Sequence, residues 1–373
     1  MTARRVAIAA VLLVAQATAP LAQDTGADRF AQGMAHHSGD GVLQDYRAAA
    51  GHIRAAAEQG YAPAANMLGR YHFEGLGVAR DRAQALRWLE VAADTGEPNF
   101  VFDLAQVLET DPATTPRAAT LYATAAQAGL ADAAVNLGVL YQQGRGVAQD
   151  YDRARSLYDG PAANGHPRAL NNLGLLYVRA NGVPQDYARA ADLFAQAAEQ
   201  GLAQAMTNLA VLYENGFGVP LDEARAAELY RAAGQGTARP PDYVYDPRLV
   251  PLTLEVEAAA LVALVQTGDP VAQFQWAWLV LTDAGSDLAN RTDAARLLQR
   301  TAHQGHGPSM FNLGLLYMRG IGVPQDYVLG HQWLLLAQVA GVAEAGAALD
   351  ATASRLTVDQ VNEAQRRAHT YTQ

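Results

Sequence analysis

Residues able to carry catalytic chemistry are few in this chain of 373 residues. There is no cysteine and every one of the 27 basic residues is arginine, which excludes a cysteine nucleophile, a Schiff-base lysine and a P-loop lysine. The Ser-x-x-Lys motif of penicillin-recognising enzymes is excluded too. None of the serines lies in a Gly-x-Ser-x-Gly turn; they are Ser38, Ser156, Ser286, Ser309 and Ser354. We predict no catalytic residue and a protein that is not an enzyme.

Histidines form two close pairs, His36 with His37 and His303 with His306. Neither pair has a third histidine or a carboxylate at the spacing of a zinc site. Gly-x-Gly pairs are frequent, but none follows a predicted strand, as a dinucleotide-binding loop requires. We therefore expect no metal site and no cofactor.

The elements that position the remaining side chains are repeats. In residues 169–204, Ala169, Leu173, Leu176 and Tyr177 have the spacing of one apolar face of an amphipathic helix. The sequence Asn-Gly-Val-Pro then ends this helix, because glycine readily adopts positive φ and proline disfavours the helical region for the residue before it. An alanine-rich second helix follows. Since neither helix can bury its apolar face alone, neighbouring units must stack into a solenoid.

Three positions recur together along the chain. The leucine recurs at Leu68, Leu104, Leu137, Leu173, Leu209 and Leu313, with intervals of 36, 33, 36 and 36 residues across the first five. Nine residues later stands a glycine, as in Gly182, and thirteen residues later an aspartate, as in Asp186, placed to cap the second helix. Gly174, beside the leucine, has no side chain and lets the second helix approach closely.

This pattern, Ala-x-x-x-Leu-Gly-x-x-Tyr-x-x-Gly-x-Gly-Val-x-x-Asp followed by an alanine-rich helix, closely resembles the Sel1-like repeat, a relative of the tetratricopeptide repeat. The resemblance covers nearly all of the chain after about residue 28. It implies an all-α, right-handed solenoid of about eight stacked helix-turn-helix repeats, whose usual role is to hold other proteins in a signalling or envelope complex. The third unit lacks the Gly-x-Gly-Val turn, and the first and seventh units are degenerate.

Residues 1–22 have the layout of a cleaved signal peptide. Arg4 and Arg5 precede an apolar stretch at residues 6–15, which is too short to span a membrane comfortably. We expect a periplasmic or secreted protein without stable membrane insertion after cleavage; the alternative is an uncleaved anchor. Loss of the two arginines changes the net charge from −10 to −12, which argues against nucleic-acid binding.

The repeat pattern divides the rest of the chain. Repeats 1–6 are assigned to residues 28–236, degenerate and C-terminal repeats to 257–345, and a capping helix to 346–373. A Pro-rich loop at 237–256 interrupts the array, because four prolines exclude a continuous helix there. Tyr243 and Tyr245 in this loop are candidates for exposed binding residues. The alternative is that the loop only packs onto the solenoid.

Polar side chains recur on one face of the first helices. One set precedes the leucine and the other follows it by six residues; they are Asn136, Asn172, Asn208 and Asn312, with Gln143, Arg179, Asn215 and Arg319. Both positions lie on the same side of a helix, away from the apolar stripe. In tetratricopeptide-like solenoids the first helices line the concave groove, where amides can bond a peptide backbone. The alternative is that the asparagines bond neighbouring repeats and fix their stacking. We call these eight residues the polar ladder.

These observations predict a non-enzymatic periplasmic scaffold that binds a protein or peptide through the concave face of its repeats and regulates an envelope or signalling complex. The alternative function is binding or hydrolysis of peptidoglycan fragments or β-lactams, which has been proposed for some members of this family. Its motivation is only the exported setting and these activities proposed for family members.

Overall fold

The computed structural model describes residues 24–235, 242–249, 258–283 and 285–372, and these residues form nineteen helices and no strand. The predicted all-α solenoid of helix-turn-helix repeats is confirmed. The first helices of repeats 1–6 are α1 (Gly26–Ser38), α3 (Ala62–Glu74), α5 (Pro98–Glu109), α7 (Ala131–Gln143), α9 (Pro167–Arg179) and α11 (Ala203–Asn215). Their second helices are α2 (Tyr46–Glu58), α4 (Arg82–Ala93), α6 (Thr115–Gln127), α8 (Tyr151–Ala163), α10 (Tyr187–Glu199) and α12 (Glu223–Gln235).

The C-terminal part of the chain continues the array. After α13 (Ala258–Thr267) come repeat 7, made of α14 (Pro270–Thr282) and α15 (Leu288–His303), and repeat 8, made of α16 (Gly307–Arg319) and α17 (Tyr327–Val339). Residues 346–373, expected to hold one capping helix, contain two: most of α18 (Ala345–Ala353), and α19 (Val358–Thr372). Thr357 and Gln360 form a reciprocal cap at the start of α19. The predicted signal peptide lies outside the described residues.

The repeat pattern is explained by the local structure. Asp186 caps α10, since its carboxylate accepts the backbone N–H of Arg189 at 2.9 Å. Gly174 leaves no room for a side chain, because a Cβ there would lie 2.6 Å from the ring of Phe194 on α10. Gly218 has φ +70°, and a Cβ there would lie 2.3 Å from the backbone of Ala188 in the preceding repeat. Glycine is therefore required both within and between repeats.

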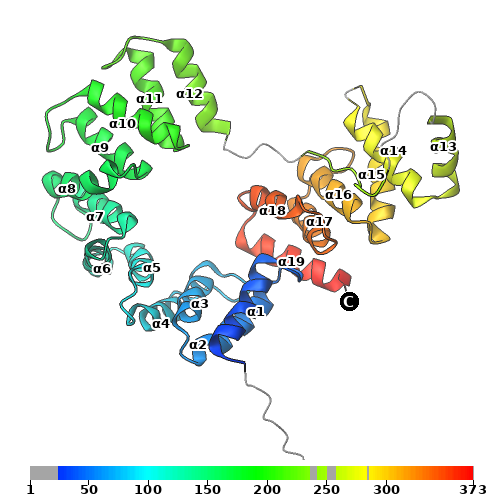
Figure 1. Cartoon of the computed structure of the whole chain (residues 1–373), viewed down its shortest axis with the longest axis horizontal. Coiled ribbons are helices and arrows are strands. Elements are labelled where there is room, and N and C mark those ends of the chain that lie inside the picture. Colours follow the sequence, from blue (N-terminus) through cyan, green and yellow to red (C-terminus); the bar gives the residue numbers. More distant parts are fainter. Residues whose placement is uncertain (1–23, 236–241, 250–257, 284, 373) are drawn as a thin grey trace, which may run out of the picture.

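The recurring leucines form the core between the helices. All six leucines of the pattern are at most 5% exposed. Figure 1 shows α3, α5 and α7 on the inner side of the arc, with α4, α6 and α8 outside them. Side chains on the first helices that point away from this core therefore face the interior of the arc. Among the described residues, no helix is both long enough and apolar enough to cross a membrane.

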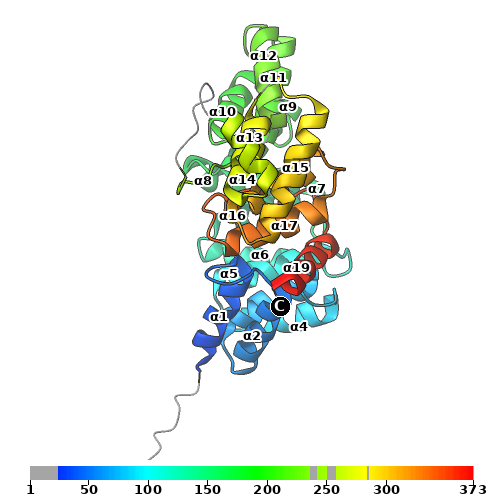
Figure 2. The same ribbon diagram turned by 90° about the vertical axis from the view of Figure 1, so that its right-hand side faces the viewer.

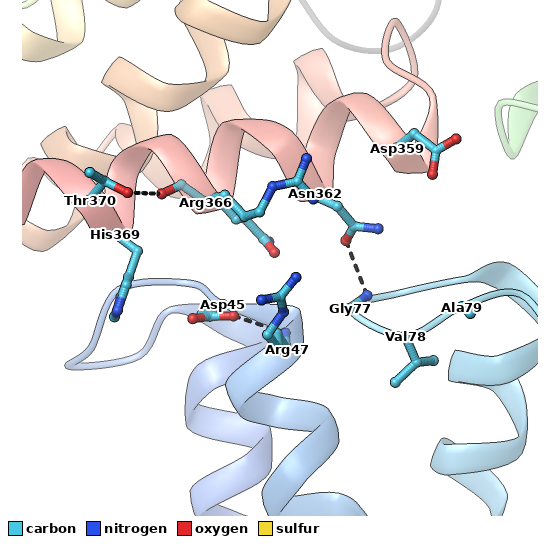
Figure 3. Close-up of a pocket in the computed structure, with 11 residues that line it drawn as sticks. Asp45, Arg47, Gly77, Val78, Ala79, Asp359, Asn362, Arg366, His369 and Thr370 are labelled. Carbon is cyan, nitrogen blue, oxygen red and sulfur yellow. Dashed lines mark hydrogen bonds between the residues drawn. The ribbon is translucent and has the colours of Figure 1, made fainter.

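The two ends of the solenoid meet, which the sequence pattern did not predict. Helix α19 lies beside the N-terminal repeats in both views (Figure 1 and Figure 2). Asn362 accepts the N–H of Gly77 at 3.1 Å and donates to the carbonyl oxygen of Gly75 at 2.9 Å (Figure 3). Gln365 accepts the N–H of Tyr46 at 2.9 Å. Helix α19 thus binds the turns of repeats 1 and 2 through their backbone.

A cavity of about 530 Å³ lies at this junction (Figure 3). Arg47 and Arg366 line it together with Asp45 and Asp359, so its charge is mixed. Arg366 also forms an ion pair with Glu363 on its own helix. The cavity is therefore a polar gap in the interface between α19 and the N-terminal repeats.

Candidate functional site

A surface depression of about 550 Å³ lies over three consecutive first helices. We call it the repeat-5 groove, because α9 supplies most of its lining. Its residues are Val139 and Gln143 of α7, Arg168, Asn171, Asn172, Leu175 and Arg179 of α9, and Ala203, Gln204, Thr207 and Asn208 of α11. Most of these side chains carry amide, hydroxyl or guanidinium groups, which suit the recognition of a polar ligand such as a peptide backbone.

Two asparagines of the polar ladder bond neighbouring repeats. Asn136 donates to the hydroxyl of Tyr122 at 3.3 Å and accepts from Arg168 at 2.7 Å. Asn208 donates to Asn171 at 2.8 Å. These two side chains therefore contribute to the stacking of the repeats around the groove.

The other ladder residues in repeats 4–6 differ in how far they are engaged. Asn172 is half-buried and is hydrogen-bonded to the hydroxyl of Tyr158. Arg179 is exposed, and no hydrogen bond or ion pair joins it to another described residue. Gln143 accepts from Arg145 at 2.7 Å, and Asn215 donates to a carbonyl of its own helix at 2.9 Å. Of these four, Arg179 is the side chain most available to a ligand.

In repeat 8 the ladder binds another segment of the chain, residues 242–249. Asn312, which is fully buried, accepts the N–H of Val244 at 2.8 Å and donates to the carbonyl oxygen of the same residue at 2.8 Å. The guanidinium of Arg319 lies 5.1 Å from the ring centre of Tyr243, within cation–π distance. Two ladder positions therefore hold an extended segment by its backbone and by one aromatic ring.

The tyrosines of this segment are half-buried, so the expectation that they are exposed is wrong. The ring of Tyr245 contacts Phe274 and Trp278 of α14, with centroid separations of 5.7 and 4.9 Å. Gln275 donates to the hydroxyl of Tyr245 at 2.8 Å. The segment is packed on repeats 7 and 8.

Asp246, His306 and Ser309 form a chain of polar contacts that resembles a catalytic triad. His306 Nε2 lies 2.9 Å from Asp246 Oδ2, and His306 Nδ1 lies 2.7 Å from Ser309 Oγ. The Arg248 guanidinium, hydrogen-bonded to the carboxylate at 2.8 Å, holds the pKa of Asp246 well below its usual range.

Burial excludes a nucleophilic role for this serine. Ser309 is 0% exposed, and its hydroxyl also accepts from Thr301 at 2.6 Å. His306 is the N-cap of α16 and accepts the N–H of Ser309. The three residues therefore anchor the 242–249 segment to the start of α16. Within the described parts of the chain, no group of three histidine, aspartate or glutamate side chains could hold a metal ion.

Comparison with known proteins identifies the repeats. The Sel1 repeat model matches residues 31–61, 62–96, 131–159, 167–202, 203–236, 270–306 and 307–337. The chain belongs to the Sel1 repeat family. The matches include units 1 and 7, at residues 31–61 and 270–306, which we expected to be degenerate. They omit the third unit, which lacks the glycine turn.

One solved structure with a TM-score above 0.5 supports this Sel1 assignment, and two others are less similar. A Sel1 repeat protein from Oxalobacter formigenes is 27% identical, with a TM-score of 0.53, and the match covers 60% of this chain and 90% of that one. A protective antigen of uropathogenic Escherichia coli strains, described as displaying an SLR fold, is 24% identical (TM-score 0.35; 93% and 92% covered). An immunity protein from Pseudomonas aeruginosa is 20% identical (TM-score 0.39; 59% and 86% covered). Comparison with curated proteins found no match.

Sel1 repeat proteins generally mediate protein–protein interactions, and their fold is typically a non-catalytic scaffold. The polar ladder predicted from the sequence lacks Gln275, which holds in repeat 7 the position that the ladder asparagines hold in their own repeats. The signal was present, because Ala272 keeps the register of that repeat and places Gln275 next to Trp276 in the leucine position. The pairing of Asn312 with Val244 had no local signal, because 68 residues separate them.

Proposed function

We propose that this Sel1 repeat protein is a non-enzymatic scaffold that binds a protein partner through the repeat-5 groove. The observation that carries the proposal is that Asn172 and Arg179 both line this groove of about 550 Å³. Arg179 has no hydrogen bond or ion pair within the described chain, and the Asn172 amide keeps hydrogen-bonding capacity beyond its contact with Tyr158.

The chemistry of the groove favours a peptide or protein over other ligand classes. An amide offers both donors and acceptors, which match the N–H and C=O groups of an extended backbone. A guanidinium adds recognition of an aromatic ring or a carboxylate. The net charge of −10 for the whole chain disfavours nucleic acid, whose phosphates require a basic surface.

We further propose that the scaffold acts outside the cytoplasm, in the periplasm or after secretion, in an envelope or signalling complex. The support is the sequence of residues 1–22, with Arg4 and Arg5 before a short apolar stretch. Cell fractionation and N-terminal sequencing test this proposal. We expect a mature chain that begins between residues 18 and 23; a cytoplasmic chain with residue 1 or 2 at its start would contradict export.

The partner-binding role is tested by in-cell crosslinking, affinity capture and mass spectrometry. The double variant Asn172→Ala with Arg179→Ala is compared with the unmodified chain and with Arg231→Gln, an exposed arginine on the second helix α12. We expect a partner that is captured by the unmodified chain and by Arg231→Gln but is lost from the double variant. Thermal unfolding must show that the double variant stays folded, since Asn172 contacts Tyr158. Equal capture by all three chains would contradict the assignment of the groove.

A further inference from the structure

Helices α9 and α16 carry the same three polar residues at the same spacing. A histidine caps the helix, an asparagine follows six residues later, and an arginine ends the helix seven residues after that; the sets are His166, Asn172 and Arg179 in α9, and His306, Asn312 and Arg319 in α16. The histidine rings accept equivalent backbone N–H groups, at 3.4 Å in α9 and 3.3 Å in α16. No other first helix among the described residues carries all three.

In α16 each of the three residues contacts the 242–249 segment. The contacts follow the segment in order: Tyr243 lies against Arg319, Val244 bonds Asn312, and Asp246 bonds His306. The segment therefore runs antiparallel to α16. This arrangement shows how a peptide segment can bind the histidine, asparagine and arginine of one first helix at the same time.

We infer that α9 binds an extended peptide in the same direction and register. An aromatic ring of the peptide lies on Arg179, and the N–H and C=O groups of the next residue bond the amide of Asn172. The inference rests on the proposed function and specifies its ligand class, a peptide segment with an aromatic residue followed by a residue whose backbone is free to bond. The segment then runs toward the start of α9.

The amide of Asn172 has the capacity for this contact. An asparagine side chain has two N–H donors and an oxygen with two lone pairs. Its bond with Tyr158 uses one of these, and the contact from Asn171 to its oxygen is long, at 3.4 Å. A donor and an acceptor therefore remain for a peptide backbone.

Differences between the two sites refine the expected peptide. His166 Nε2 already lies 3.3 Å from Asp132 of the preceding repeat, which Arg168 also contacts at 3.3 Å, so Asp132 takes the place beside His166 that Asp246 has beside His306. The peptide does not need an acidic residue two positions after the bonded one. Val139 of α7 holds the position of Trp278 in α14 and leaves more space for the residue after the bonded one.

The test uses a fluorescently labelled peptide with the sequence of residues 242–249, Asp-Tyr-Val-Tyr-Asp-Pro-Arg-Leu, and the full mature chain. Binding is measured by fluorescence anisotropy. We expect Asn172→Ala to weaken binding at least about tenfold, because two hydrogen bonds are lost, and Arg179→Gln to weaken it about three- to tenfold. Arg231→Gln is the matched control and leaves binding unchanged. Because Arg179 is exposed, Arg179→Gln also reports on the site if Asn172→Ala fails to fold.

Altered peptides test the register. N-methylation of the valine in this peptide removes the N–H that bonds Asn172 and should weaken binding about fivefold or more. Replacement of the preceding tyrosine by alanine should weaken binding to the unmodified chain as much as Arg179→Gln does. In the Arg179→Gln variant the same replacement should cause no further loss of affinity, as expected for two groups in direct contact. Replacement of the second aspartate by asparagine should have little effect.

Two results would overturn the inference. One is the absence of binding at ~1 mM peptide. The other is binding that depends on Asn312 but not on Asn172, which would mean that the probe replaces the 242–249 segment in its own site. If either occurs while the double variant still loses its partner in cells, the groove binds a partner but not this class of peptide. The proposed function then stands without the inference.

Discussion

Asn312 and Val244 are joined by two hydrogen bonds of 2.8 Å, although 68 residues separate them in the chain. One amide side chain satisfies both backbone groups of a residue that belongs to no helix or strand. Because buried backbone groups must be bonded, this pair explains how an extended segment can pack against a helical surface. It also shows that the polar ladder has backbone-binding capacity in at least one repeat.

Asn312→Ala should release the 242–249 segment. The backbone N–H and C=O of Val244 would lose their partners, at a cost of about 1–3 kcal/mol. We expect faster hydrogen exchange at the Val244 amide and earlier proteolytic cleavage within the segment. Asn290→Ala, at an exposed position of α15, serves as the control. Unchanged exchange at Val244 would show that Tyr245 and Asp246 hold the segment without Asn312.

Glycines in the repeat turns should differ in tolerance according to what their Cβ would meet. Gly60 has φ +82°, and a Cβ added there would meet no other atom within 4 Å. Gly60→Ala should therefore cost only the strain of the left-handed conformation, ~1–2 kcal/mol. Gly218 has a similar φ of +70°, but its Cβ would lie 2.3 Å from the Ala188 backbone. Gly218→Ala should therefore cost clearly more in chemical denaturation. Equal costs would mean that neighbouring repeats separate easily.

The end of α9 is strained, because Ala180 has φ 56° where α7, α11 and α16 end at glycine. A left-handed conformation costs a non-glycine residue ~1–2 kcal/mol, and the extra freedom of glycine in the unfolded chain offsets part of that. Ala180→Gly should stabilise the protein by up to about 1 kcal/mol. Gly216→Ala, at the same position of α11, should have the opposite sign. Two changes of the same sign in denaturant midpoint would contradict this account.

The sequence predicted those features that depend on local repetition. The leucines, the Asp186 cap and the close approach at Gly174 recur in most of the repeats, so one repeat explains the others. Contacts formed once could not be predicted in this way. The bonds from Asn362 to Gly77 and from Asn312 to Val244 join residues 285 and 68 positions apart, and no periodicity marks them.

The contact between the two ends of the solenoid should depend on Asn362 and Gln365. These side chains bond the backbones of Gly77 and Tyr46. The double variant Asn362→Ala with Gln365→Ala should speed hydrogen exchange at both backbone amides and increase the radius of gyration in small-angle scattering. Thr372→Ala is the control, because Thr372 is exposed and bonds only its own helix. Unchanged protection of Gly77 would show that apolar packing alone closes the arc.

His331 should make the protein less stable in mild acid. The side chain is 2% exposed and burial lowers its pKa to about 4, below the ordinary value of 6.5. The unfolded chain therefore binds a proton before the folded one, and stability is complete above pH 6.5 and falls as the pH decreases toward 4. With these values, about 2 kcal/mol should be lost between pH 7.5 and pH 5.

Substitution of His331 separates this effect from general acid denaturation. Neither ring nitrogen has a hydrogen-bond partner among the described residues, so His331→Leu removes two unsatisfied buried atoms along with the titrating group. We expect the variant to be at least as stable at pH 7.5 and to lose about 2 kcal/mol less by pH 5. Asn290→Ala, at an exposed position without a titrating group, should retain the wild-type dependence. If His331→Leu and the wild type show the same decrease in unfolding free energy, the proton uptake occurs at other residues.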